Sequence, residues 1–270
     1  MTYFQSIILG MIQGASEFLP ISSSGHLVLA PALFGWEILP REAFLFDVLV
    51  QVATLAAVII YYWTDLITIL KSWTRSLFTG QSFRDPESLL GWYLILSTLP
   101  AGVSALLFKE TLEASFSNPT FAAIFLLVTS VLLLGGEFAG KRKRDLSSIT
   151  WLDSLIIGVF QVLALFPGIS RSGSTIAAGL LRNFDRKTSA RYSFLMAVPV
   201  MTAAGLMAGY DLIRSPLLLA NLPVYFAGFI SAAIVGYLAI RWLIAFLSQS
   251  SLYVFALYCA LVGVGFLIFL

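Results

Sequence analysis

The sequence predicts an all-α polytopic membrane protein, with six transmembrane helices plus two re-entrant helical hairpins in an inverted-topology repeat. Three observations predict this class. Of the 270 residues, 59% are hydrophobic and only 11% are charged, whereas about 25% of residues are charged in a soluble domain. Six apolar runs are long enough to cross about 30 Å of hydrocarbon as helices. Two further stretches carry polar motifs that align with each other.

The first element in chain order is a helical hairpin with a polar tip. Its first limb, residues 4–19, ends at Pro20, and its second limb, residues 27–36, reaches only about 15 Å, half a bilayer. Pro, Gly and Ser at the tip favour a re-entrant hairpin, because such backbone is tolerated inside a membrane only where protein or a water-filled cavity satisfies it. Two ordinary spans, each cut by a loop, are the alternative.

Three full spans complete the first repeat, residues 1–138. They are expected at residues 44–63, 89–108 and 118–138. Asp47, Gln51 and Thr54 are spaced so that they share one face of the first span, and we expect that face to turn inward. The alternative is that Asp47 lies near the lipid headgroups and is simply solvated.

Residues 139–150 form a basic loop that precedes the second repeat. Its run from Lys141 to Arg144 is typical of a cytoplasmic topology determinant, so we expect no nucleic-acid partner. The second repeat, residues 151–270, has the same plan within a single membrane domain. Its hairpin limbs are expected at residues 152–166 and 174–184, and its spans at residues 188–210, 218–241 and 249–270.

The two repeats are related by aligning Gly158 with Gly10, which also aligns Gln161 with Gln13. A re-entrant hairpin ends on the side of the membrane where it began, whereas three spans end on the other side. The second repeat therefore enters the membrane from the opposite face to the first. Placing the N-terminus outside puts most Lys and Arg residues in or near cytoplasmic segments, as the positive-inside rule requires. The hairpin tips can then meet near the midplane, where inverted repeats build their sites.

The second hairpin tip has the composition of an anion site. Ser170, Arg171, Ser172 and Thr175 place hydroxyls and a guanidinium at a helix start, where free N–H groups and the helix dipole favour an anion. The arginine fork suits phosphate oxygens. A structural ion pair between Arg171 and Glu17 is the alternative.

The first hairpin tip carries an acid, hydroxyls and the single histidine of the chain. The carboxylate of Glu17 can hold a cation or accept a proton, Ser23 can attack or bind phosphorus, and His26 can move a proton near neutral pH. The alternatives are a hydrogen-bonded core histidine and, for Ser22 to Ser24, helix capping.

At these residues the chain resembles the undecaprenyl-diphosphatase family, integral-membrane enzymes also called bacitracin-resistance proteins. Gln13, Glu17, Ser23 and His26 match the first family motif. The second, Pro-Gly-x-Ser-Arg-Ser-x-x-Thr, is matched by Pro167, Gly168, Ser170, Arg171, Ser172 and Thr175. The resemblance covers essentially the whole chain in length, hairpin order and spans.

The resemblance implies hydrolysis of undecaprenyl diphosphate to undecaprenyl phosphate and inorganic phosphate, which recycles the lipid carrier for cell-wall synthesis and confers bacitracin resistance. It implies a bacterial cytoplasmic (inner) membrane protein whose active site faces the periplasmic side, and it leaves a homodimer open. It also implies a magnesium or calcium ion. Some members have Glu where this chain has Gln13, so a second carboxylate ligand beside Glu17 is in doubt.

The candidate site residues fall into four groups. The catalytic group is Glu17, Ser23, His26 and Arg171; the phosphate-binding group is Ser22, Ser24, Gly168, Ser170, Arg171, Ser172 and Thr175; the metal group is Glu17 with Gln13; the secondary group is Asp47 and Gln51. A transporter or flippase is the alternative function, because inverted repeats with broken hairpins also build transporters. A transporter needs no nucleophile or proton donor, which Glu17, Ser23 and His26 supply.

Overall fold

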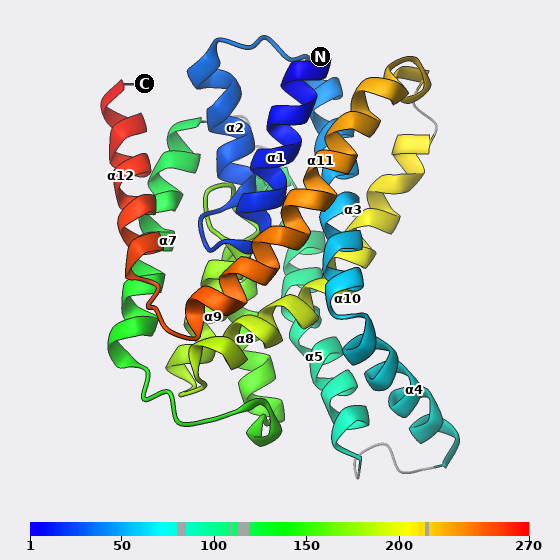
Figure 1. Ribbon diagram of the computed structural model, residues 1–270, viewed down its shortest axis with the longest axis vertical. Helices are drawn as coiled ribbons and strands as arrows, with labels where there is room; N and C mark the ends of the chain where they lie inside the picture. The colour runs from blue at the N-terminus through cyan, green and yellow to red at the C-terminus, as the bar shows by residue number, and fades with distance from the viewer. Residues whose placement is uncertain (80–84, 109, 113–118, 214–215, 270) are drawn as a thin grey trace.

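The chain folds into a bundle of helices (Figure 1). The computed structural model describes residues 1–79, 85–108, 110–112, 119–213 and 216–269, and the named elements within these ranges are all helical. Many large apolar side chains lie on the outside of the bundle, and Phe138 and Phe269 are 90% and 89% exposed. Such a surface suits a lipid environment. The chain is therefore an all-helical, multi-pass membrane protein.

Five helices of the described residues are long and apolar enough to cross a membrane. They are α3 (Pro40–Tyr61), α5 (Pro86–Leu107), α7 (Pro119–Ala139), α10 (Arg186–Ile213) and α11 (Pro216–Leu247). Each overlaps one predicted span. The sixth predicted span corresponds to α12 (Tyr253–Phe269), an apolar helix of 17 residues, or about 26 Å at 1.5 Å per residue. The count of six spans therefore stays a prediction.

Each predicted hairpin is a pair of short helices. The first pair is α1 (Tyr3–Phe18) and α2 (Ser23–Phe34), and the second is α8 (Trp151–Leu163) and α9 (Arg171–Leu181). Both first limbs begin with a capping box, formed by Thr2 with Gln5 and by Thr150 with Asp153, which fixes the start of each helix. The α2 and α9 helices begin earlier than predicted, because serine residues cap them within the motifs.

The hairpins approach each other from opposite ends of the bundle (Figure 1). The α1 helix starts at the end where both chain termini lie, and α8 starts nearer the other end, so both helices run toward the tips. Their tips meet: Ser172 on α9 donates to the carbonyl oxygen of Leu19 at 3.1 Å. This is the meeting of tips that the sequence predicts, whereas the re-entrant depth and the inverted topology stay predictions.

Glycine allows the first limb of each hairpin to contact a helix of the other half. A Cβ at Gly10 of α1 would lie 2.3 Å from the carbonyl oxygen of Gly228 in α11, and one at Gly158 of α8 would lie 2.5 Å from that of Ser97 in α5. Real Cβ atoms do not approach so closely. The two halves are thus packed through their hairpins, although the division at residues 139–150 stays a prediction.

The amphipathic helix α4 (Trp63–Thr79) was not expected from the sequence. It packs on α5, where the rings of Trp73 and Trp92 are in edge contact at 5.4 Å and Ser88 donates to Ser76 at 2.6 Å. Only two of its residues, Ile69 and Ser76, are buried. The charged residues Asp65, Lys71 and Arg75 interrupt its sequence, so it gives a weaker hydropathy signal than the apolar spans.

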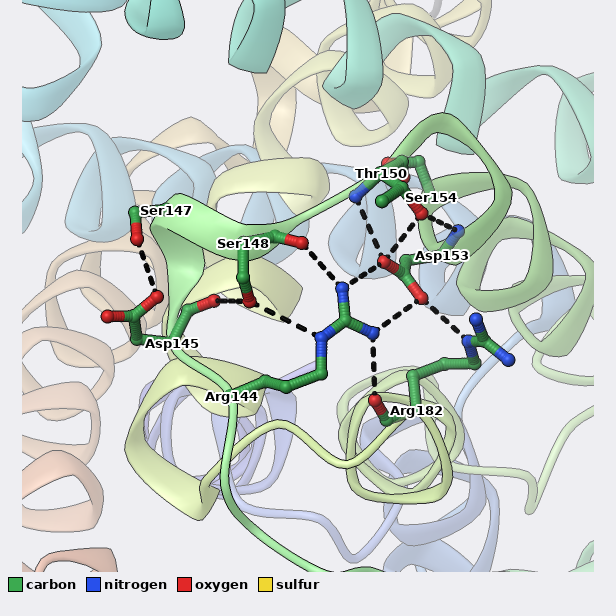
Figure 2. Close-up of polar contacts among 8 residues, drawn as sticks. All are labelled: Arg144, Asp145, Ser147, Ser148, Thr150, Asp153, Ser154 and Arg182. Atoms are coloured by element: carbon green, nitrogen blue, oxygen red, sulfur yellow. Dashed lines mark hydrogen bonds and ion pairs between the residues drawn. The ribbon is translucent and has the colours of Figure 1, made fainter.

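Ion pairs connect the basic loop to the base of the second hairpin (Figure 2). Arg144 donates to both carboxylate oxygens of buried Asp153, at 3.0 and 2.6 Å, and Arg182 donates to the same carboxylate at 2.6 Å. This carboxylate raises the pKa of Arg144 above its usual value. A second buried acid, Glu137 at the end of α7, accepts from Arg186 at 2.7 Å. The loop therefore has a structural role in addition to its predicted topological one.

Candidate active site

A cavity of about 330 Å³ lies where the two hairpin tips meet α3, α5 and α10. Its polar lining residues are Ser16, Glu17, Ser22, Ser23, Ser24, Gln51, Gln161, Ser170 and Arg171. Its apolar lining residues are Ala101, Leu112, Ala164, Leu165, Ile169, Val200, Met201 and Ala204. Polar groups thus gather on the hairpins, and the surrounding spans supply most of the apolar wall.

Glu17 connects the two hairpins inside this cavity. Its Oε1 accepts a hydrogen bond from Nη2 of Arg171 at 2.6 Å, and its Oε2 accepts one from Oγ of Ser23 at 2.6 Å. Oε2 also accepts from Nε2 of Gln13 at 3.0 Å. The carboxylate is 7% exposed, so burial is offset by a cation and two polar donors.

Arg171 can fill both roles that the sequence left open, the ion pair with Glu17 and the binding of an anion. Nη2 forms the ion pair with Glu17, while Nη1 is buried and has no hydrogen-bond partner among the described residues. An unpartnered guanidinium N–H in a cavity is a donor suited to an anionic oxygen. The ion pair therefore positions the guanidinium, and its other edge can bind a ligand.

Helix caps place the reactive residues at the cavity. Ser22 caps α2, with its Oγ accepting from the N–H of Gly25 at 3.2 Å, and Ser170 caps α9, accepting from Gly173 at 3.0 Å. Ser23 and Arg171 are consequently the first residues of their helices. Two helix N-termini lie at one cavity, and their dipoles favour negative charge.

Three residues of the second motif hold the tip and do not line the cavity. Ser172 donates to the first hairpin, and Thr175 donates to the carbonyl oxygen of Arg171 at 2.7 Å. Gly168 has a φ of +96°, and a Cβ there would lie 2.2 Å from the carbonyl oxygen of Ala122. Their predicted contacts with phosphate stay predictions.

The secondary candidates Asp47 and Gln51 lie in different surroundings on α3. Gln51 lines the cavity, whereas Asp47, one turn earlier on α3, is outside its wall. Thr54 is buried and donates to the backbone of its own helix, at 2.9 Å to Gln51. The predicted polar face of this span therefore reaches the cavity at Gln51.

His26 is directed toward α12. Its Nδ1 lies 2.7 Å from the carbonyl oxygen of Ser22 and therefore carries the proton, since a carbonyl oxygen only accepts. Its Nε2 then accepts from the hydroxyl of Tyr258, also at 2.7 Å. His26 is not a residue of the cavity wall, and its catalytic role stays a prediction.

Three polar residues in or near the site were not among the predicted site residues: Ser16, Gln161 and Tyr258. Gln161 lines the cavity, and its alignment with Gln13 was the signal that could have identified it. Tyr258 contacts His26, but it lies in an apolar run with nothing in the sequence to distinguish it from other aromatic residues.

A hard cation fits this cavity only together with a ligand. Within the described ranges, no three His, Cys, Asp or Glu side chains are grouped closely enough to hold a metal ion. The cavity offers the Glu17 carboxylate, and the buried Oε1 of neighbouring Gln13 is an unpartnered oxygen. Magnesium usually combines one or two carboxylates with substrate phosphate oxygens, and this donor set is consistent with that arrangement.

Comparison with known proteins identifies the family. The model of the bacitracin resistance protein BacA family matches residues 6–265. The chain belongs to this family. It is 41% identical over 268 residues to the undecaprenyl-diphosphatase of Methanosphaera stadtmanae, covering 96% of this chain and 95% of that one. It is 40% identical to the undecaprenyl-diphosphatase of Moorella thermoacetica, covering 96% and 94%.

The similarity extends to further relatives of the same name. The undecaprenyl-diphosphatase of Thermomicrobium roseum is 37% identical over 275 residues, covering 99% of this chain and 98% of that one. Coverage of nearly the full length includes both hairpins, so the cavity and its connecting residues lie within the family match.

Proposed function

We propose that this BacA family member is an integral-membrane phosphatase that hydrolyses undecaprenyl diphosphate to undecaprenyl phosphate and inorganic phosphate. This activity recycles the lipid carrier for cell-wall synthesis and confers bacitracin resistance. The names of the relatives support the substrate, and the geometry supports the reaction. The observation that carries it is the Glu17 carboxylate, which binds the Ser23 hydroxyl and the Arg171 guanidinium at 2.6 Å each.

The Ser23–Glu17 hydrogen bond has the geometry of a nucleophile with its base. Ser23 Oγ attacks the terminal phosphorus while its proton passes to Glu17. The bond between that phosphorus and the bridging oxygen breaks, and undecaprenyl phosphate leaves. Arg171 Nη1 and the N-termini of α2 and α9 stabilise the negative charge on the transferred phosphoryl group.

The phosphate oxygens have further donors in the same wall. Ser22, Ser24 and Ser170 line the cavity beside Ser23 and Arg171. Ser22 and Ser170 already use an Oγ lone pair to cap a helix, and their hydroxyl hydrogens can still be donated. These residues orient the terminal phosphate relative to Ser23.

A magnesium or calcium ion completes the proposal. Glu17 would hold it together with diphosphate oxygens, and the Gln13 carboxamide oxygen is a candidate second ligand. When bound, it would neutralise part of the diphosphate charge. His26 is proposed to handle a proton, and because its Nε2 accepts from Tyr258, the two residues would act as a pair.

We also propose the finer topology for this multi-pass protein. Six spans and two re-entrant hairpins would form an inverted repeat in the bacterial cytoplasmic membrane, with the site facing the periplasmic side. The paired capping boxes at Thr2 and Thr150 and the hairpins that approach from opposite ends support this arrangement (Figure 1). A flippase is not favoured, because transport does not require a serine bound to a carboxylate.

Phosphate release by the purified protein tests this function. Wild-type protein in detergent should release phosphate from undecaprenyl diphosphate, and Arg171→Lys should lose most of this activity while folding normally. Lysine provides a point charge in place of the planar fork, and a lost transition-state contact lowers the rate about ten-fold per 1.4 kcal/mol. Wild-type activity in Arg171→Lys would contradict the phosphate-binding assignment.

A further inference from the structure

Gln161 is a buried polar residue of the cavity whose side chain is only half satisfied. It lies on α8, is 2% exposed and lines the cavity. Its Nε2 donates to the carbonyl oxygen of Ser97 at 3.4 Å, and its buried Oε1 has no hydrogen-bond partner in the part of the chain that the structure describes. Leaving a buried acceptor unsatisfied is unfavourable, because the oxygen has lost its hydrogen bonds to water. The side chain therefore has an unused acceptor beside the proposed reaction site.

The packing of α8 on α5 decides which way this amide points. Gly158, one turn before Gln161, brings α8 into direct contact with the backbone of Ser97. The Ser97 carbonyl oxygen can only accept, so it selects the amide nitrogen of Gln161. The amide oxygen of this cavity-lining side chain is consequently left without a donor among the described residues.

An unpaired acceptor is unsuited to phosphate. The terminal phosphate of a diphosphate presents mainly acceptor oxygens, which match the free donor Nη1 of Arg171 and not a carbonyl oxygen. The Oε1 of Gln161 therefore needs a hydrogen-bond donor or a cation. Water is a neutral donor, and the hydrolysis reaction consumes it.

We propose that Gln161 is a positioning residue that holds the hydrolytic water. The proposal rests on the function above, in which Ser23 accepts the phosphoryl group. The water donates one hydrogen bond to Gln161 Oε1 and attacks the phosphorus of phosphorylated Ser23. The bond between phosphorus and Ser23 Oγ breaks, Glu17 returns its proton to that oxygen, and the released phosphate retains the protons of the water.

The variant Gln161→Met tests this role, because methionine has a similar length and no carbonyl acceptor. In the purified full-length protein, kcat should fall about ten-fold or more, with KM for undecaprenyl diphosphate little changed. Added methanol competes with water for the phosphoryl group. The ratio of methyl phosphate to phosphate should rise in Gln161→Met, and Gln161→Glu, which retains an acceptor oxygen, should restore a lower ratio.

The control is Gln249→Met, the same change at an exposed turn after α11, which should match wild type in rate and ratio. An unchanged ratio of methyl phosphate to phosphate in Gln161→Met would overturn the proposal. If that ratio is unchanged and the variant needs more magnesium, Gln161 is a cation ligand instead. If Gln161→Met does not fold, Gln161→Asn, whose amide is one methylene shorter, is measured in its place and the same ratio decides.

These outcomes are separate from a failure of the proposed function. If Arg171→Lys is inactive and Gln161→Met is like wild type, the cavity is the reaction site and only the role of Gln161 is wrong. If the wild-type protein releases no phosphate from undecaprenyl diphosphate, the proposed function itself is wrong, and the role of Gln161 fails with it.

Discussion

At the scale of single residues, Glu17 connects three parts of the candidate site. It contacts the partner hairpin through Arg171, its own hairpin tip through Ser23, and its own helix through Gln13. One carboxylate therefore organises a donor to phosphate and a nucleophile in a single cavity. This sharing also means that a change at Glu17 would disturb several contacts together, so its effects must be separated by measurement.

The serines at the first tip are expected to differ sharply in importance. Ser23→Ala should abolish most activity, because it removes the hydroxyl bound to Glu17. Ser22→Ala should mainly lower stability by about 1 kcal/mol through loss of the α2 cap. Rates and melting temperatures of Ser22→Ala, Ser23→Ala and Ser24→Ala check this order. A Ser23→Ala variant more active than both others would exclude Ser23 as the nucleophile.

Glu17 and His26 should separate in their response to metal and to pH. Glu17→Gln should lower the rate, because it removes the base that takes the Ser23 proton, and should raise the magnesium or calcium requirement, because one ligand loses its charge. His26→Ala should alter the pH dependence of the rate and leave the metal requirement nearly unchanged, since the imidazole is bound to Tyr258 and not to the cavity wall. The measurement is activity against metal concentration at several pH values, and a reversed pattern would exchange the two roles.

At the scale of elements, close helix contacts place the second hairpin. Gly136 of α7 is buried against α9, and a Cβ there would lie 2.9 Å from Cα of Ala177. Arg171 begins the same helix α9. Packing of α7 on α9 therefore determines where the guanidinium meets Glu17.

Neighbouring glycines on α7 provide a matched test of this packing. Gly136→Ala should lower the melting temperature and reduce activity, because α9 must move away from α7. Gly135→Ala should do neither, since its Cβ meets nothing within 4 Å and alanine favours a helix by about 1 kcal/mol over glycine in water. Thermal unfolding and phosphate release of both variants check this, and equal melting temperatures would show that the contact is not important.

At the scale of the whole molecule, two buried acids secure the end of the bundle that holds the basic loop. Asp153 binds Arg144 and Arg182, and Glu137 binds Arg186 and the N–H of Leu252 (Figure 2 shows the Asp153 cluster). These contacts join the loop, the second hairpin and the start of α12. The hairpin is therefore fixed at its base as well as at its tip.

The orientation of the molecule can be measured directly. With the N-terminus outside, a cysteine placed at Lys143 in a Cys259→Ala background should resist a membrane-impermeant reagent in intact cells, because the loop is cytoplasmic. A cysteine at Thr2 should be labelled, since the N-terminus lies at the opposite end of the bundle (Figure 1). Labelling at position 143 in intact cells would overturn the topology and with it the inverted repeat.

The sequence by itself determined the fold class and the family. Long apolar runs predict helical spans because an unpaired backbone cannot enter hydrocarbon, and five of the six predicted spans are long apolar helices in the structure. The duplicated motifs predicted that two polar tips would meet, and the BacA family match covers both. The motif residues Glu17, Ser23 and Arg171 lie together in the cavity.

Only the tertiary structure decided how these residues are used. Spacing along the chain cannot show that Arg171 donates one edge to Glu17 and leaves Nη1 unpartnered among the described residues, or that cavity-lining Gln161 keeps an unpaired amide oxygen. It cannot show that His26 turns toward Tyr258, far away in the sequence. These choices depend on contacts between elements, such as Gly158 against Ser97. Local sequence determines which helices form, and packing between distant segments determines which polar atoms are satisfied and which remain available for a ligand.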